Sequence, residues 1–125
     1  MLRQDAKILI ADDSRIIRIA MSRVFKELGY ANIIEAEDGV RAVELHASER
    51  PDLIMLDIVM PNMGGDEALA KIRDKDRVTP VIMLSSVAKQ SQIDACKALG
   101  IVEFVVKPLT AETGKEMVRD LLERL

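Results

Sequence analysis

Residues 52–57 read Asp-Leu-Ile-Met-Leu-Asp (DLIMLD), an almost unbroken apolar run that ends in a carboxylate. Four more short apolar runs follow or precede it along the chain, separated by longer stretches with helical periodicity. Three of the five runs are nearly continuous in Val, Ile, Leu and Met, which is typical of strands covered by helices on both faces. The five predicted strands are Lys7–Ala11, Asn32–Ala36, Asp52–Leu56, Pro80–Leu84 and Val102–Val106.

The intervals between the runs have the apolar spacing of amphipathic helices. Gly29 and Gly100 follow two of these intervals, at the position after a helix end where glycine is favoured. Thr110 is the predicted N-cap of the last helix. Strict alternation of strand and helix predicts an α/β fold: a doubly wound parallel sheet with right-handed crossovers and helices on both faces.

Length and composition set further bounds on the chain. Its 125 residues fit a single domain over 1–125, and we expect no attached output domain. A net charge of -3 argues against a general nucleic-acid or membrane-surface binder. One cysteine, Cys96, excludes an internal disulfide and suits a reducing compartment. The longest apolar stretch, 53–60, is too short to span a bilayer and no leader is evident, so we expect a cytoplasmic protein.

Polar residues stand at the ends of four of the runs. Asp12 and Asp13 follow the first, Asp57 the third, Ser85 the fourth and Lys107 the fifth. In an open parallel sheet the chemistry lies outside the carboxyl ends of the strands. If these four strands are neighbours, three carboxylates, a hydroxyl and an ammonium converge at one edge.

Such a cluster favours metal-assisted phosphoryl chemistry. Two carboxylates about 4 Å apart repel by about 4 kcal/mol near a protein surface, so three of them require more than one counter-charge. Mg²⁺ prefers carboxylate oxygens, and Asp12 and Asp13 suit it. Asp57 suits a nucleophile that forms an aspartyl-phosphate. Lys107 and the Ser85 hydroxyl can then contact phosphoryl oxygens.

Taken together, these residues resemble the response-regulator receiver domains of two-component signalling, over essentially the whole chain. The resemblance implies a flavodoxin-like sheet of strand order 2-1-3-4-5. It also implies a Mg²⁺ requirement and phosphorylation of Asp57 by a sensor histidine kinase or a histidine phosphotransfer protein. A receiver domain is not a turnover enzyme, because it catalyses only its own phosphorylation and dephosphorylation. The matching residues are Asp12-Asp13, Asp57-Ile58-Val59-Met60-Pro61, Gly65, Ser85 and Lys107-Pro108.

The resemblance also implies roles for individual residues. The metal would be held by Asp13, Asp57 and the backbone carbonyl of Val59, with Asp12 assisting through water. The Lys107–Pro108 bond corresponds to a cis peptide of the family.

A switch is implied as well. Ser85 stands where a Thr or Ser moves toward the phosphoryl group, and Phe104 where a Tyr or Phe then turns inward. The signal would reach a downstream protein, in chemotaxis-type or phosphorelay signalling, through the face formed by the fourth helix, fifth strand and fifth helix.

Three positions depart from the commonest family pattern. Gly64 replaces a frequent Asp or Asn and is expected to loosen the loop after Asp57. Val59 and Val87 stand two residues beyond Asp57 and Ser85, at positions thought to flank the attacking water. Our hypothesis is that these apolar side chains slow dephosphorylation.

The same positions and others in the chain allow further interpretations. Asp13 or Ser14 alone is explained equally well as a helix N-cap. Ser86 is predicted to be structural, and His46 to be solvated rather than catalytic. An enzyme of the haloacid-dehalogenase type needs a second Asp where this chain has Val59. A receiver-like binding module that never carries phosphate is the third possibility.

Overall fold

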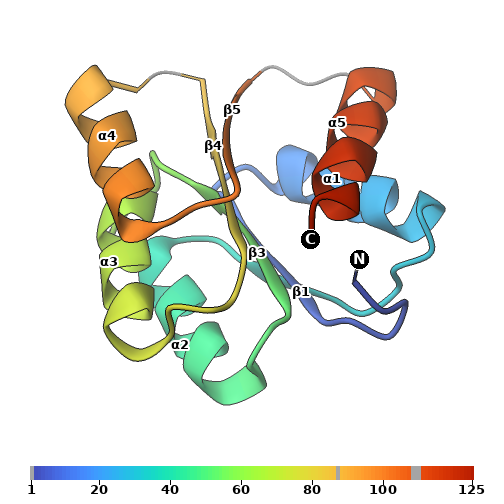
Figure 1. The fold of residues 1–125 in the computed structure, drawn as a ribbon, viewed down its shortest axis with the longest axis horizontal. Helices are drawn as coiled ribbons and strands as arrows, with labels where there is room; N and C mark the ends of the chain where they lie inside the picture. Colours follow the sequence, from blue (N-terminus) through green and yellow to red (C-terminus); the bar gives the residue numbers. More distant parts are fainter. Residues whose placement is uncertain (1, 87, 108–110) are drawn as a thin grey trace.

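The computed structural model describes residues 2–86, 88–107 and 111–125 (Figure 1). Val87, Pro108 and Thr110, to which the sequence assigned a water-flanking, a cis-peptide and a capping role, lie outside the described residues. The strands are β1 (Ile8–Ala11), β2 (Ile33–Ala36), β3 (Leu53–Asp57), β4 (Val81–Ser85) and β5 (Glu103–Val106). The helices are α1 (Arg15–Glu27), α2 (Gly39–Glu49), α3 (Gly65–Lys75), α4 (Gln90–Leu99) and α5 (Ala111–Glu123).

The five strands form one parallel sheet in the order β2-β1-β3-β4-β5. This confirms the predicted fold class and strand order. The register pairs Ala11 with Leu56, Asp57 with Leu84, and Ser85 with Val106. The carboxyl ends of β1, β3, β4 and β5 therefore lie side by side, as the placement of the polar residues requires.

Helices cover both faces of the sheet, with α1 and α5 on one side and α2, α3 and α4 on the other (Figure 1). Each layer has its own buried cluster: Phe25 of α1 packs with Ile8 and Ile10, while Cys96 of α4 shares a cluster with Leu9. Alternate residues of β1 thus face opposite layers, which explains why the strand is apolar throughout. Burying a side chain the size of Phe25 contributes about 1.5–3 kcal/mol.

Helix ends follow the predicted punctuation where the structure describes them. The Ser14 hydroxyl oxygen accepts a hydrogen bond from the Ile17 amide at 3.3 Å, so Ser14 is the N-cap of α1. Gly29, with φ of 101°, follows the end of α1, and Gly100, with φ of 91°, ends α4. Because Ser14 supplies the cap, the Asp13 side chain is not used for it. Within the described residues, no helix is both long and apolar enough to cross a membrane.

Candidate functional site

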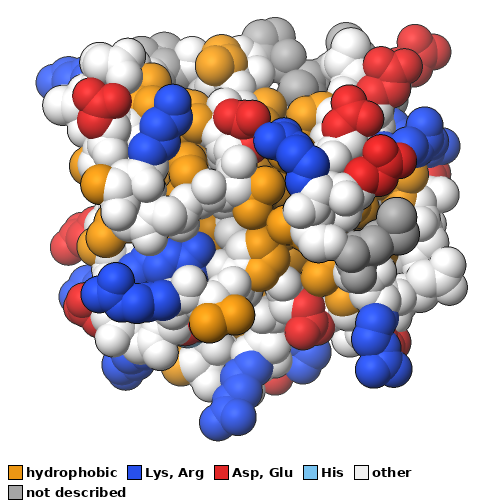
Figure 2. All heavy atoms as spheres, viewed as in Figure 1, with side chains coloured by type: hydrophobic (Ala, Val, Ile, Leu, Met, Phe, Trp, Pro, Cys, Tyr) orange, Lys and Arg blue, Asp and Glu red, His pale blue; other side chains and the backbone are white. Residues whose placement is uncertain are grey.

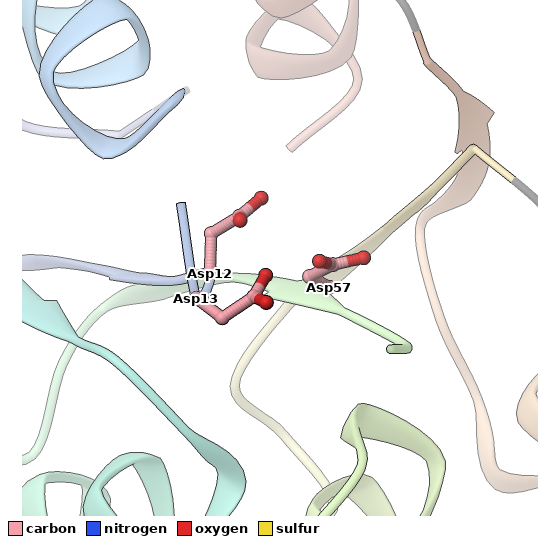
Figure 3. A group of neighbouring side chains, drawn as sticks. All are labelled: Asp12, Asp13 and Asp57. Carbon is pink, nitrogen blue, oxygen red and sulfur yellow. The ribbon is translucent and has the colours of Figure 1, made fainter. Parts of the chain in front are cut away.

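Three carboxylates gather at the carboxyl end of the sheet (Figure 3). Asp12 and Asp13 come directly after β1, and Asp57 is the last residue of β3. One oxygen from each of the three lies within 4.8 Å of the others. Asp12 is 1% exposed and Asp57 4%, whereas Asp13 is exposed to solvent. The structure therefore brings together the three acids that the sequence assigned to this site.

Lys107, directly after β5, extends its ammonium into the same cluster. Its Nζ lies 2.5 Å from Asp12 Oδ2 and 3.2 Å from Asp57 Oδ2, and its side chain is only 12% exposed. The Lys107 backbone amide donates to the Ser85 carbonyl oxygen at 2.8 Å, which continues the β4–β5 pairing beyond the strands. Fixed by that bond, the lysine is aimed inward rather than into solvent.

The turn after β1 is held from two directions. The Ser14 amide donates to Asp12 Oδ1 at 2.9 Å. From one turn into α1, Arg18 donates through Nη1 to the Asp12 carbonyl oxygen at 2.6 Å and pairs with Glu35 at 3.0 Å. Sequence reasoning did not single out Arg18. In the sequence, Arg18 is marked only by its place about one helical turn after the Asp12-Asp13 pair. Many surface arginines stand at such positions, so this place alone does not predict the contact.

The three carboxylates of the cluster carry more negative charge than one lysine can neutralise, and Asp12 and Asp57 are buried. Burial raises the pKa of Asp57, the charge of Asp12 raises it further, and Lys107 offsets these effects only in part. Burial acts to lower the pKa of Lys107, but its contacts with Asp12 and Asp57 outweigh burial and raise it. The ammonium stays charged, and the two buried acids still compete for it.

The donor set fits a hard divalent cation. Three carboxylate oxygens within 4.8 Å of one another are the ligands that Mg²⁺ prefers, and one lysine leaves them with excess negative charge. Asp13 is exposed, and no described residue donates a hydrogen bond to its carboxylate, so its oxygens are available to a ligand. Of the three acids, Asp13 offers the most accessible carboxylate oxygens.

A cavity of about 510 Å³ opens beside the cluster. The three acids and Lys107 line one part of it, and apolar side chains line the rest, including Ile17 and Met21 of α1 and Leu84 of β4. Val59 stands at its edge with 61% of its surface exposed. The site can therefore admit a group the size of a phosphoryl next to the carboxylates.

The two serines after β4 differ in position. Ser85, the predicted hydroxyl donor, is the last residue of β4 and is buried. Ser86, predicted to be structural, lines the cavity instead. Phe104, the predicted switch aromatic, is half-buried on β5 opposite Met83 and packs against the α2–α3–α4 layer. No described contact tests a switch role for Ser85 or Phe104, so that role stays a prediction.

Gly65 explains why the loop after Asp57 can return so tightly. Its amide donates to the Ile58 carbonyl oxygen at 2.8 Å, and an added Cβ would lie 1.9 Å from the Asp57 carbonyl oxygen. A side chain at this position would displace the backbone that carries Asp57. Gly64, the departure noted above, is the N-cap of α3 and offers no side-chain cap.

A second polar cluster, formed by His46 and Asp76, lies near the amino ends of β3 and β4, where the sequence predicted no site. His46 Nε2 is 2.9 Å from Asp76 Oδ2, and both side chains are largely buried. The prediction that His46 is solvated is therefore wrong. Because His46 and Asp76 are 30 positions apart in sequence, no local pattern predicted their contact.

Comparison with known proteins agrees with this geometry. Residues 8–119 match the model of the response regulator receiver domain. The chain is 40% identical over 107 residues to the chemotaxis protein CheY of Listeria monocytogenes, covering 85% of this chain and 89% of that protein. It is 38% identical to the chemotaxis protein CheY of Bacillus subtilis, covering 93% and 97%. The CheY chain in a CheX–CheY–BeF3–Mg complex from Borrelia burgdorferi superposes with a TM-score of 0.84 at 32% identity, covering 96% of this chain and 90% of that one.

Proposed function

The chain belongs to the family of response regulator receiver domains, and from that membership we propose that it accepts a phosphoryl group on Asp57 in a Mg²⁺-dependent reaction. The observation that supports this most directly is the cluster itself: three carboxylates within 4.8 Å of one another, with the buried Lys107 ammonium against two of them. A site built only for stability would pair these charges more evenly.

The described residues divide the chemistry among them. An Asp57 carboxylate oxygen attacks the phosphorus of a phosphohistidine; a P–O bond forms, the P–N bond breaks with its electron pair on nitrogen, and the imidazole, protonated by solvent, leaves as a neutral ring. Lys107 neutralises a phosphoryl oxygen, and the Ser85 hydroxyl donates to another. Asp13, Asp57 and the Val59 carbonyl would hold Mg²⁺, with Asp12 assisting. When bound, the metal supplies positive charge opposite the phosphoryl oxygens.

The phosphoryl donor is, in this proposal, a sensor histidine kinase or a histidine phosphotransfer protein. The curated relatives named above are chemotaxis proteins, which supports a chemotaxis-type pathway for this chain. A Mg²⁺ and BeF3 complex of a similar chain with CheX shows that the related protein engages another protein in that state. These relatives support a protein target for the phosphorylated form of this chain.

The target would contact the face formed by α4, β5 and α5. Hydrophobic side chains are exposed along the middle of this face, with charged side chains around them (Figure 2). Val106 of β5 and Leu99 of α4 are among the exposed hydrophobic residues. A phosphoryl group adds about 1.5 to 2 negative charges, enough to bias a two-state loop that connects Asp57 to this face through Ser85 and Phe104.

The test is phosphorylation by a small acyl phosphate. Wild type incubated with acetyl phosphate and Mg²⁺ should gain the mass of one phosphoryl group, and the gain should disappear with EDTA. Asp57→Asn should gain nothing, whereas Asp52→Asn, which changes the acid immediately before β3, should react like wild type. No gain on the wild type, or an equal gain on Asp57→Asn, would contradict the proposal and favour a binding module that never carries phosphate.

A further inference from the structure

The loop that follows Asp57 is fastened to the start of α2. Asn62 Nδ2 donates to Asp38 Oδ2 at 2.7 Å, and the Gly39 amide donates to the Met63 carbonyl oxygen at 3.0 Å. The two segments are more than 20 residues apart in sequence, and both contacts reach the same stretch of the loop. We call these two contacts the loop clasp.

Asp38 serves the clasp and the helix at once. Its Oδ1 accepts from the Arg41 amide at 2.8 Å, which makes Asp38 the N-cap of α2, while its Oδ2 accepts from Asn62. A carboxylate fixed by a helix cap is a rigid anchor, because the cap already restricts its rotamers. Asn62 is thereby attached to a helix rather than to another loop.

The backbone at the clasp is shaped for close contact. A Cβ added to Gly39 would lie 2.3 Å from the Met63 carbonyl oxygen, so only glycine allows this approach. Asn62 has φ of 65°, in the left-handed region that asparagine tolerates better than most residues. Two uncommon backbone requirements are met at the same contact, although each side chain involved is partly or fully solvent-accessible.

The clasp lies a few residues beyond Val59, whose backbone carbonyl is proposed to hold the metal. Gly65 donates to the Ile58 carbonyl oxygen and so joins the two ends of the loop, while the clasp holds residues 62 and 63. Val59 lies between the fixed Ile58 and the clasp; its amide donates to the Asp57 carboxylate, and its side chain is exposed and provides little packing. We propose that Asp38 and Asn62 are positioning residues that hold the Val59 carbonyl in place for the cation. This inference rests on the proposed function.

Calorimetric titration of the whole chain with Mg²⁺ tests the inference. Asp38→Ser keeps an N-cap hydroxyl but is too short to reach Asn62, and Asn62→Gly keeps the left-handed backbone but removes the amide. Each should raise the Mg²⁺ dissociation constant by about tenfold, as loss of supporting contacts does at other metal sites. Asp38→Asn keeps the cap through its carbonyl oxygen, and its amide can donate to Oδ1 of a flipped Asn62 side chain, so this variant should stay close to wild type.

A matched control separates the clasp from a general change of charge. Asp94 accepts a hydrogen bond from Gln90 at 2.8 Å on exposed α4, so Asp94→Ser loses the same kind of contact and the same charge. It should leave Mg²⁺ affinity unchanged. The double variant Asp38→Ser/Asn62→Gly should bind no more weakly than the worse single variant, because both remove one contact. Urea unfolding in EDTA shows that every variant is folded.

The outcomes distinguish the clasp from the site it supports. One outcome is that wild type binds Mg²⁺ and Asp13→Asn loses that binding, while the clasp variants bind like wild type. In that case the positioning role of Asp38 and Asn62 is wrong, and the proposed metal site stands. The clasp also fails if Asp94→Ser weakens binding as much as Asp38→Ser, or if the two single effects add in full. If wild type binds no Mg²⁺, or Asp13→Asn binds it equally, both proposals are wrong.

Discussion

Near the amino ends of the strands, the Asp76 carboxylate accepts hydrogen bonds from several donors. At the carboxyl ends, the Asp57 carboxylate competes with Asp12 for the Lys107 ammonium. The Asp76 carboxylate accepts from the amides of Val78 and Thr79 at 2.9 and 3.0 Å, from the Thr79 hydroxyl at 2.5 Å, and contacts His46 at 2.9 Å. Asp57 shares one lysine with a second buried acid. Both residues are aspartates, and what distinguishes them is the number of donors around each carboxylate.

The titration of the two acids moves in opposite directions. Partial burial acts to raise the pKa of Asp76, but hydrogen bonds from His46, Thr79 and Val78 outweigh it and hold the pKa well below the usual range. At Asp57 burial and Asp12 together raise the pKa. A carboxylate with its donors already in place contributes to stability, whereas one with unmet charge is available to a cation and an electrophile.

Removing the shared cation should produce the largest effect. Lys107→Ala leaves three carboxylates with no lysine between them and deletes the charge opposite a phosphoryl oxygen. We expect phosphorylation of Asp57 by acetyl phosphate to slow by about 100-fold, the usual cost of losing one charge-stabilising donor. Lys115→Ala is the control, because it removes an ammonium from an exposed pair with Glu27 at 3.6 Å. An equal rate in Lys107→Ala, measured by mass spectrometry over time, would contradict the assigned role.

Asp76→Asn tests the other end of the sheet. The amide can still accept from the backbone but loses the charge, so we expect the free energy of unfolding at pH 7 to fall by about 1–2 kcal/mol. Because the folded-state pKa is depressed, this contribution is complete above the unfolded value near 3.8 and is lost as pH falls through the folded pKa. The difference from wild type should therefore shrink below about pH 4.

Urea unfolding at several pH values measures that difference directly. Asp74→Asn, an exposed acid on α3 two residues away, is the control and should change stability little at any pH. A loss in Asp76→Asn that is constant from pH 7 to about pH 2.5 would show that the charge is irrelevant and that only the shape of the turn matters.

The same contrast explains how far the sequence could predict the molecule. Runs such as 52–57 identified the strands because burial on both faces leaves an apolar pattern, and Asp57 was found because it interrupts that pattern at a strand end. Parallel pairing then places strand ends together by rule. The His46–Asp76 pair and the Arg18 contact left no such mark, because they depend on helix packing between residues distant in sequence or common on surfaces.

Unmet charge at Asp57 also predicts a change in stability. In EDTA, Asp57→Asn should raise the free energy of unfolding by about 1 kcal/mol, because it removes one of two buried acids that compete for Lys107. Saturating Mg²⁺ should stabilise wild type but not the variant. Asp94→Asn on exposed α4 should be unchanged in either condition. A loss of stability in Asp57→Asn would place this acid with Asp76, as a structural carboxylate.

The smallest expected effect concerns the lifetime of the phosphorylated state. Val59 has an exposed apolar side chain at the edge of the cavity and cannot hydrogen-bond a water that attacks the phosphoryl group. An amide at this position can, so Val59→Asn should speed dephosphorylation about fivefold, the equivalent of one net hydrogen bond. Decay of the phosphorylated mass after removal of the donor gives the rate.

Val78→Asn is the matched control, since Val78 is 89% exposed in the turn that Asp76 organises. The same substitution near the amino ends of the strands should leave the decay unchanged, because no reacting group lies there. Equal decay in wild type and Val59→Asn would show that Val59 does not limit access of water. A faster decay in both variants would mean that the phosphoryl lifetime depends on the whole domain rather than on the edge of the cavity.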